Sequence, residues 1–308
     1  MKTLIQAVRH FSDPQVCIDT VAAMRWPDGK PVCPKCGGLS HYYLATQSRW
    51  KCKACSKQFS VKVGTIFEDS PISLDKWLVA MWMIGNCKNG VSSYEVAKAV
   101  GITQKSAWFM LHRIRVAMQD DGDSPLSGIV EMDETFVGGK VKNMHKAKRV
   151  KALAAPHSFK GKAIVVGMLE RNGRVRAEVV AERTRAVLHD IAHANIAPGS
   201  TLMTDELYGY RGVSFRHEVI NHAEAYVRGH IHTQGIENFW SLLKRGLTGT
   251  YISVEPFHLF RYIDEQAFRY NNRKDKNDAQ RLTQVLSQVA GKRLTYAEVT
   301  GKVGQTAF

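Results

Sequence analysis

A chain of 308 residues can hold two or three domains, and a hydrophobic content of 44% excludes an intrinsically disordered protein. No apolar run approaches the ~18 residues of a membrane span, and the opening residues lack the apolar core of a secretory signal, so we expect a cytoplasmic protein. The net charge of +15, from 43 Lys and Arg against 28 Asp and Glu, favours a polyanionic partner, most commonly nucleic acid.

The first predicted elements are a short helix and a metal-binding module. The helix begins at Pro14, with Ser12 or Asp13 as its cap. Two C-x2-C pairs follow, formed by Cys33, Cys36, Cys52 and Cys55. Disulfides or a redox-active pair are the alternatives, but neither explains two matched pairs, and a cytoplasmic location disfavours disulfides. The spacing predicts one structural zinc ion that keeps a short module folded.

Three helices are predicted between residues 73 and 119. Ser92 and Glu95 form a capping box at the start of the second helix, and Gly101 makes a tight turn before the third. A short helix, a glycine turn and a longer helix with polar residues first are typical of a helix-turn-helix. In that interpretation Gln104 and Lys105 face DNA, whereas an ordinary helical hairpin is the alternative.

From residue 129 the hydrophobic pattern alternates, which indicates strands. We expect, in chain order, a strand through Asp133, a hairpin turning at Asn172-Gly173, a helix over 185–195, a strand ending at Asp205, a short fifth strand, and helices from Gln234 and Pro256. This order predicts an α/β domain with a mixed sheet and helices against its faces.

A basic segment lies between the first of these strands and the hairpin. It contains no acid, and its cations are Lys140, Lys142, Lys146, Lys148, Arg149, Lys151, Lys160 and Lys162. Such a run is most often a solvated loop. Because no acid neutralises it and it follows an acidic strand end, we favour contact with the DNA backbone.

Three carboxylates on separate elements are the candidate catalytic residues. Asp133 lies within a presumed central strand, where a carboxylate is costly unless it is paired or metal-bound. Asp205 closes a strand, where α/β sheets tend to place ligand sites, and Glu237 begins a helix. Cleavage of a phosphodiester needs an activated nucleophile and a stabilised leaving oxygen, which two carboxylate-bound Mg2+ ions supply. A cap, a turn or a surface ion pair is the alternative for each acid alone.

The helix with Glu237 also carries two cations, Lys244 and Arg245. Its apolar residues recur at helical spacing and form one buried stripe, while Lys244 shares the face of Glu237 about 10 Å further along the axis. Arg245 lies beside Lys244, and its charge makes it a candidate DNA contact, with a solvated face as the alternative. His222, His230 and His232 precede this helix, and we favour DNA contact or packing for them over a metal ligand or a proton shuttle.

Several long motifs resemble one family. The stretches "MDETFVGGK", "TDELYGY" and "IENFWSLLKRGLTGTY" closely resemble insertion-sequence transposases of the IS1595 group with their ISXO2-like DDE domain, and the four-cysteine segment resembles the zinc ribbon that precedes that domain. The resemblance implies an RNase H-like fold in which Asp133, Asp205 and Glu237 bind two Mg2+ or Mn2+ ions. Asn238 is the alternative third position, because this group varies there. The resemblance also implies that Lys244 contacts DNA near the cleaved end.

These observations predict four segments. They are an N-terminal helix and zinc ribbon (1–62), a helix-turn-helix domain (63–122), an RNase H-like catalytic domain (123–275) with a basic insertion (140–162), and a C-terminal tail (276–308). By the resemblance, the first two bind the terminal inverted repeats of a mobile element, and the third cleaves its ends and joins them to target DNA as a dimer or larger assembly. A DNA-binding regulator with an inactive α/β domain and a nuclease that does not join ends remain the alternatives.

Overall fold

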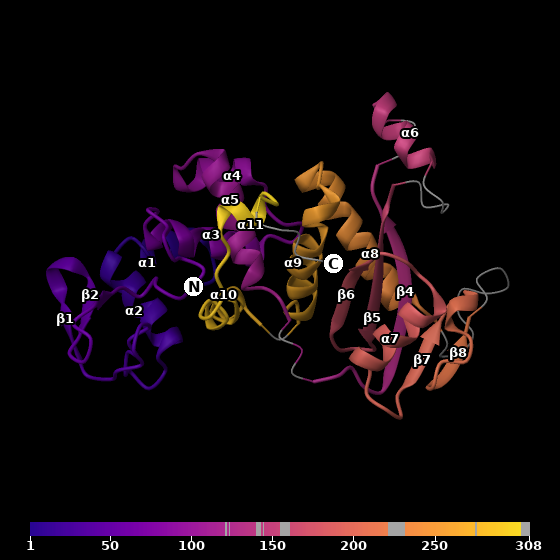
Figure 1. The fold of residues 1–308 in the computed structure, drawn as a ribbon, viewed down its shortest axis with the longest axis horizontal. Helices are drawn as coiled ribbons and strands as arrows, with labels where there is room; N and C mark the ends of the chain where they lie inside the picture. Colours follow the sequence, from indigo (N-terminus) through magenta and orange to yellow (C-terminus); the bar gives the residue numbers. More distant parts are fainter. Residues whose placement is uncertain are drawn as a thin grey trace. The chain divides into compact units, whose positions relative to one another are not determined.

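The computed structural model describes residues 1–120, 122, 124–139, 143, 145–154, 161–220, 232–274 and 276–302. The chain divides into two compact units (Figure 1). Unit 1 consists of Met1–Gln119 and the described residues from Asn272 onward, and unit 2 consists of Asp120–Asn271. In the part of the chain that the structure describes, no helix is long and apolar enough to cross a membrane.

Unit 1 begins with two helices and a small sheet. The helices are α1 (Leu4–His10) and α2 (Pro14–Arg25), and the antiparallel sheet has the order β1 (His41–Leu44), β2 (Arg49–Cys52), β3 (Gln58–Phe59). The predicted start of α2 is confirmed, because the side chain of Asp13 accepts a hydrogen bond from the backbone N–H of Gln15. Helix α1 was not expected from the sequence. The sheet holds both cysteine pairs close together, as described below.

The helical part of unit 1 is built around α3 (Leu74–Asn86), most of whose residues are buried. The predicted capping box of α4 (Ser93–Val100) is confirmed: Ser92 and Glu95 each accept a hydrogen bond from the other's backbone N–H. Gly101 then adopts a left-handed conformation with φ of 63°, which a side chain would strain, and α5 (Gln104–Val116) follows. This geometry sets α4 against α5.

The end of the chain completes unit 1. The segment predicted as a C-terminal tail (276–308) contains two helices, α10 (Asp278–Ser287) and α11 (Tyr296–Val299). Helix α10 packs against α3. The backbone N–H of Ile66 donates to the carbonyl of Val289 at 3.1 Å, and that of Gly291 donates to the carbonyl of Gly64 at 2.9 Å. Residues more than two hundred positions apart therefore share one core.

Unit 2 contains the predicted mixed sheet flanked by helices. Its strands are β4 (Ile129–Val137), β5 (Ala163–Glu170), β6 (Val175–Val180), β7 (Thr201–Thr204) and β8 (Arg216–Val219), in the spatial order β6-β5-β4-β7-β8. Strand β4 is central, antiparallel to β5 and parallel to β7. The predicted hairpin between β5 and β6 is confirmed, and Asn172 supplies the positive φ of 63° in its turn.

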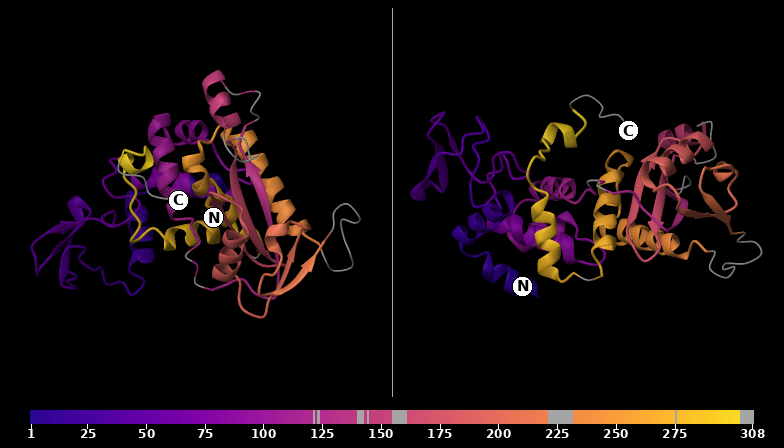
Figure 2. Two further views of the ribbon diagram at one scale, coloured as in Figure 1. Left: turned by 45° about the vertical axis from the view of Figure 1, so that its right-hand side comes forward. Right: turned by 90° about the horizontal axis from the view of Figure 1, so that it is seen from below.

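Helices cover both faces of this sheet (Figures 1 and 2). Helix α7 (Arg185–Asn195) packs on the face formed by Val130, Met132 and Val166. Helices α8 (Gln234–Gly246) and α9 (Leu259–Asn271) pack on the opposite face, where α8 buries the predicted stripe of Ile236, Phe239, Trp240 and Leu243. Within the basic segment, residues Lys146–Ala154 form helix α6.

A π-helical turn (Leu247–Tyr251) follows α8 directly and begins the connection to α9. The sequence predicted one helix from Pro256, but a 3-10 turn over Pro256–His258 comes first and α9 begins at Leu259. The whole region remains on the α8 face of the sheet.

Candidate functional site

The sheet register places the first two candidate acids side by side. Strand β4 pairs with β7 in parallel, and Glu131 lies opposite Met203. Asp133 lies two residues beyond Glu131 on β4, and Asp205 lies two residues beyond Met203, just past the end of β7. The parallel pairing therefore brings the two acids to the same end of these strands. Asp205 directly follows β7, and its Oδ1 accepts a hydrogen bond of 3.0 Å from the backbone N–H of Leu207. That bond fixes the turn in which Asp205 lies.

Helix α8 brings the third acid to the same face. Trp240, buried in the stripe of α8, donates its indole N–H to Asp133 Oδ2 at 2.9 Å. A Cβ atom at Gly167 of β5 would lie 2.4 Å from the Trp240 ring, so only glycine lets the indole lie this close to the sheet. Glu237 is exposed in the first turn of α8, and its Oε1 accepts a hydrogen bond of 2.9 Å from Thr233.

The three carboxylates interact electrostatically. Burial is the largest cause that raises the pKa of Asp133 to about 6, and the negative charges of Asp205 and Glu237 raise it further. Hydrogen bonds from the backbone of Glu134 and from Trp240 act in the opposite direction. The structure therefore places Asp205 and Glu237 within electrostatic range of Asp133, although the three acids lie on elements distant in sequence. Among the described residues, the four cysteines are the only group of three or more potential metal ligands whose ligand atoms all lie within 4.8 Å of one another.

Glu134, the neighbour of Asp133, points to the other face of the sheet. Its Oε2 accepts a hydrogen bond of 2.9 Å from Tyr210, and its buried Oε1 has no partner among the described residues. Burial first, and then the charges of Asp205 and Asp133, raise the pKa of Glu134 to about 7. This orientation agrees with the sequence interpretation that Glu134 is a poor ligand. Glu206 is exposed next to Asp205.

The donor set at this face fits divalent metal ions. Its members are carboxylate oxygens, which hard cations such as Mg2+ prefer. Burial together with the charges of Asp205 and Glu237 makes ionisation of Asp133 unfavourable when no cation is bound. A bound cation removes that repulsion, so Asp133, Asp205 and Glu237 are the residues that would hold it.

The raised pKa of Asp133 makes the stability of the metal-free protein depend on pH. Between about pH 4 and pH 6 the unfolded carboxyl is ionised while the folded one is still protonated, so stability falls as pH rises through this window. Asp133→Asn keeps an oxygen for the Trp240 N–H and removes this cost. We expect the metal-free variant to be about 2–3 kcal/mol more stable than wild type at pH 7, with the difference vanishing toward pH 4, as measured by thermal unfolding.

The four cysteines form a second metal-binding group, in unit 1. Their sulfurs all lie within 4.8 Å of one another. Cys33 Sγ is 3.7 Å from Cys55 Sγ, and Cys36 Sγ is 3.6 Å from Cys52 Sγ. Four sulfurs at ~2.3 Å from one zinc ion lie about 3.8 Å apart in a tetrahedron, so the spacing fits structural Zn2+. Burial opposes ionisation of Cys33, but backbone N–H groups of Lys35 and Cys36 outweigh it and lower its pKa to about 7.

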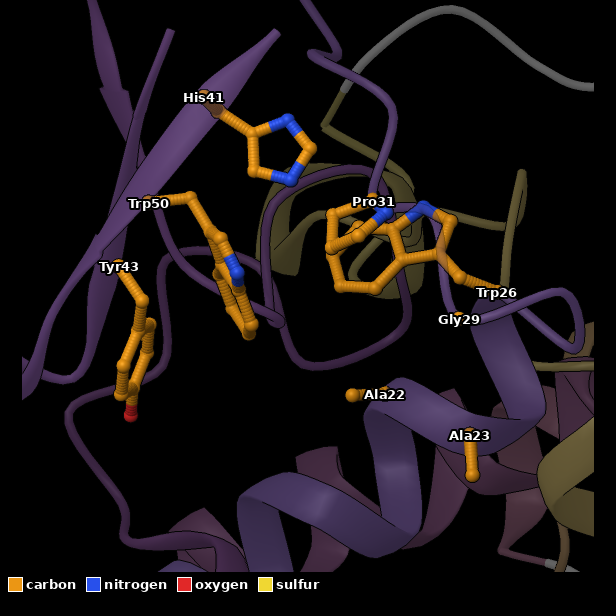
Figure 3. A pocket seen from close by; sticks show the side chains of 8 residues that line it. All are labelled: Ala22, Ala23, Trp26, Gly29, Pro31, His41, Tyr43 and Trp50. Atoms are coloured by element: carbon orange, nitrogen blue, oxygen red, sulfur yellow. The ribbon is translucent and has the colours of Figure 1, made fainter. Parts of the chain in front are cut away.

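An aromatic pocket of about 400 Å³ lies beside the ribbon and was not anticipated from the sequence. Figure 3 shows Tyr43 and Trp50 projecting from the strands toward Ala22 of α2, with Trp26 on the far side. The rings of Trp26 and Trp50 are 5.2 Å apart, and Trp50 stacks on Phe59 at 5.9 Å. These contacts join the ribbon to α2, so Trp50 reports on the folded state of the ribbon.

The predicted DNA-contacting residues are placed as follows. Lys244 and Arg245 are exposed in the last turn of α8, and Lys146 and Arg149 are exposed on α6. Lys142 and the side chain of Lys148 lie outside the described residues.

The two helix-turn-helix candidates are partly engaged within unit 1. Gln104 donates to Ser93 Oγ at 2.9 Å, which ties α5 to α4, and the ammonium of exposed Lys105 lies 5.0 Å from the centre of the Tyr296 ring. Among the histidines before α8, His232 Nδ1 is 3.3 Å from Glu131 Oε1. His222 and His230 lie outside the described residues.

Glu131 forms an ion pair and accepts a hydrogen bond from the start of α8, and neither contact was predicted from the sequence. Its side chain is 1% exposed and paired with Arg171, although it shares a strand face with Asp133. The only sequence signal for such a role was the alternation along β4, which places Glu131 on the same strand face as Asp133.

Unit 1 and unit 2 each contain a region that matches a family of transposase domains. Residues 125–271 match the family described as the ISXO2-like transposase domain, and residues 12–58 match the transposase zinc-ribbon domain. A protein of Halobacterium salinarum, described as an uncharacterized protein in transposable element ISH50, is 24% identical over 260 residues, which are 78% of this chain and 85% of that relative. Both matched regions are domains of IS1595-group transposases, and the chain carries them in the order zinc ribbon, then ISXO2-like domain.

Proposed function

We propose that this protein is a DNA transposase that cleaves the ends of its mobile element and joins the freed 3′-hydroxyl groups to target DNA. The observation that carries the proposal is that Asp133 is held on the central strand β4 by a hydrogen bond from Trp240 of α8, and that the charges of Asp205 and Glu237 add to the effect of burial in raising its pKa. We assign unit 2 the RNase H-like fold of DDE enzymes, on the basis of its mixed sheet with α8 against β4.

In this proposal the three carboxylates hold two Mg2+ or Mn2+ ions. Such ions, when bound, activate a water or 3′-hydroxyl group and stabilise the leaving oxygen of a phosphodiester. The Trp240 indole keeps Asp133 in one orientation, and the buried stripe of α8 keeps Glu237 on a rigid mount. Exposed Lys244 and Arg245 bind the phosphates of the strand that enters the site.

The remaining parts of the chain bind DNA outside the site. We propose that the zinc ribbon (1–62) and the α4–α5 pair, as a helix-turn-helix (63–122), recognise the terminal inverted repeats. Lys105 is exposed at the start of α5, where a recognition helix presents its contacts. Lys146 and Arg149 of the basic insertion (140–162) contact the backbone of the same DNA, and 123–275 is the catalytic segment. Two ends act together in a dimer or larger assembly.

A strand-transfer assay tests this function. The protein is incubated with Mg2+, a labelled duplex carrying an element end with a free 3′-hydroxyl, and a supercoiled target plasmid. We expect joined product with wild type and none with Glu237→Gln. Cutting without any joined product identifies a nuclease instead. If the protein binds DNA specifically without Mg2+ or Asp133 and yields no cut product, it is a regulator instead.

A further inference from the structure

Glu131 is an acidic side chain that both shares the face of Asp133 and is fully occupied within the protein. It is 1% exposed, and its Oε1 accepts hydrogen bonds from Arg171 Nε at 3.3 Å and Arg171 Nη2 at 3.1 Å. Its Oε2 accepts the backbone N–H of Ile236 at 3.0 Å. Both oxygens are thus engaged, which makes Glu131 unsuited to be a metal ligand itself.

The bond to Ile236 caps the helix that carries Glu237. The first N–H groups of a helix have no partner within it, and a carboxylate there also interacts favourably with the helix dipole. Thr233 is at the N-cap position, but its side chain makes no capping hydrogen bond there and donates to Glu237 Oε1 instead. Glu131 of β4 therefore supplies the cap of α8 from a neighbouring element.

Arg171 extends this connection to β7. It lies in the turn between β5 and β6, and its Nη2 contacts Met203 Sδ at 3.1 Å and the carbonyl of His232 at 3.2 Å. The backbone N–H of Arg171 also donates to the carbonyl of Ile129 at 2.8 Å. One guanidinium thus touches β4, β7 and the segment that enters α8.

The Glu131–Arg171 pair contacts each of the three ligand-bearing segments one or two residues before the proposed ligand. Glu131 precedes Asp133 by two residues, Met203 precedes Asp205 by two, and Ile236 precedes Glu237 by one. The approach of α8 is also tight, since a Cβ atom at Gly235 would lie 2.7 Å from Glu131 Oε2 and 2.4 Å from Leu169 Cδ2. No side chain fits between the helix start and Glu131.

We propose that the pair of buried Glu131 and partly buried Arg171 positions the metal site: it sets the separation of Asp133, Asp205 and Glu237 without touching the metal. The inference rests on the proposed function, because it assumes that these three acids hold divalent ions. Groups that orient metal ligands from behind typically change metal affinity 10–100-fold when removed. Glu131 and Arg171 belong to this kind of residue.

The test measures Mn2+ binding to the zinc-loaded full-length protein by electron paramagnetic resonance, without DNA. Glu131→Gln keeps the size of the side chain but turns an amide toward Arg171. Arg171→Lys keeps the charge but offers one ammonium in place of the planar fork that reaches three elements. We expect each variant to bind Mn2+ at least about 10-fold more weakly than wild type.

A matched control separates positioning from general loss of stability. Ile196→Ala opens a cavity in the core on the α7 face, where Ile196 is 2% exposed. It is expected to lower the melting temperature but to leave Mn2+ affinity within about twofold of wild type. If Ile196→Ala weakens Mn2+ binding as much as the two variants do, the inference is contradicted. Unchanged Mn2+ affinity in Arg171→Lys also contradicts it. The test with Arg171→Lys can be made even if Glu131→Gln does not fold.

Failure of the metal site itself has a different signature. Asp133→Asn is expected to abolish the bound Mn2+ signal. Wild-type protein that binds no Mn2+, or binds it equally well after Asp133→Asn, contradicts the proposed function. Binding that depends on Asp133 but is indifferent to both Glu131→Gln and Arg171→Lys contradicts only the positioning role.

Discussion

Asp133→Asn, Asp205→Asn and Glu237→Gln are each expected to lower Mg2+-dependent cleavage of an element end by at least about 10³-fold, because residues that act as one unit fail together. Each substitution keeps the size of the side chain and removes one of the three carboxylates proposed to hold the metal ions. DNA binding is expected to persist, since the charge of the protein becomes more positive. Cleavage rates and filter-binding or mobility-shift affinities measure the two properties separately.

Two neighbouring residues provide the controls for this prediction. Glu206→Gln removes an exposed acid beside Asp205 and is expected to retain cleavage within a fewfold of wild type. Asn238→Ala tests the alternative third position, because Asn238 is exposed next to Glu237. An inactive Asn238→Ala beside an active Glu237→Gln would move the third ligand by one residue. Full activity of Asp133→Asn would exclude the metal mechanism altogether.

Removal of zinc is expected to unfold the ribbon. So short a sheet buries few apolar side chains, and four-cysteine sites contribute on the order of 10 kcal/mol to the folding of small modules. Cys36→Ser changes an exposed ligand, so the effect comes from the metal and not from a lost core contact. We expect loss of the single bound zinc and a red shift of the tryptophan fluorescence, because Trp50 leaves its contacts with Trp26 and Phe59.

Cys87→Ser is the matched control, since Cys87 lies at the end of α3 and outside the four-cysteine group. It is expected to keep one zinc per chain by atomic absorption and an unshifted fluorescence maximum. Retention of stoichiometric zinc by Cys36→Ser would overturn the four-thiolate site. Loss of zinc from Cys87→Ser would do the same.

Local chemistry explains which parts of the fold were predictable. The box of Ser92 and Glu95, the Asn172-Gly173 turn and the stripe of α8 depend on residues within one or two turns of each other, and all three are confirmed. Alternation in β4 likewise places Asp133 on a face apart from Glu134, and the hydrogen bond from Tyr210 agrees with that.

The parts that escaped prediction depend on distant partners. Helix α10 is stabilised by packing on α3, which the local pattern does not reveal. The sequence named the three acids as one candidate site, but the pairing of β4 with β7 that brings two of their strands together is a distant contact. Glu131 likewise depends on its hydrogen bonds with Arg171 and with the start of α8. No spacing rule in the sequence specifies those contacts.

The division of unit 1 into two separated pieces determines the order in which the chain can fold during synthesis. All of unit 2 emerges from the ribosome before α10 exists, and α10 supplies the surface that covers α3. Unit 2 can therefore complete its core while α3, with Trp77 and Leu78 on it, still lacks its last neighbour. A nascent chain that stops before residue 278 leaves that apolar helix without the surface of α10, whereas all elements of unit 2 are already present.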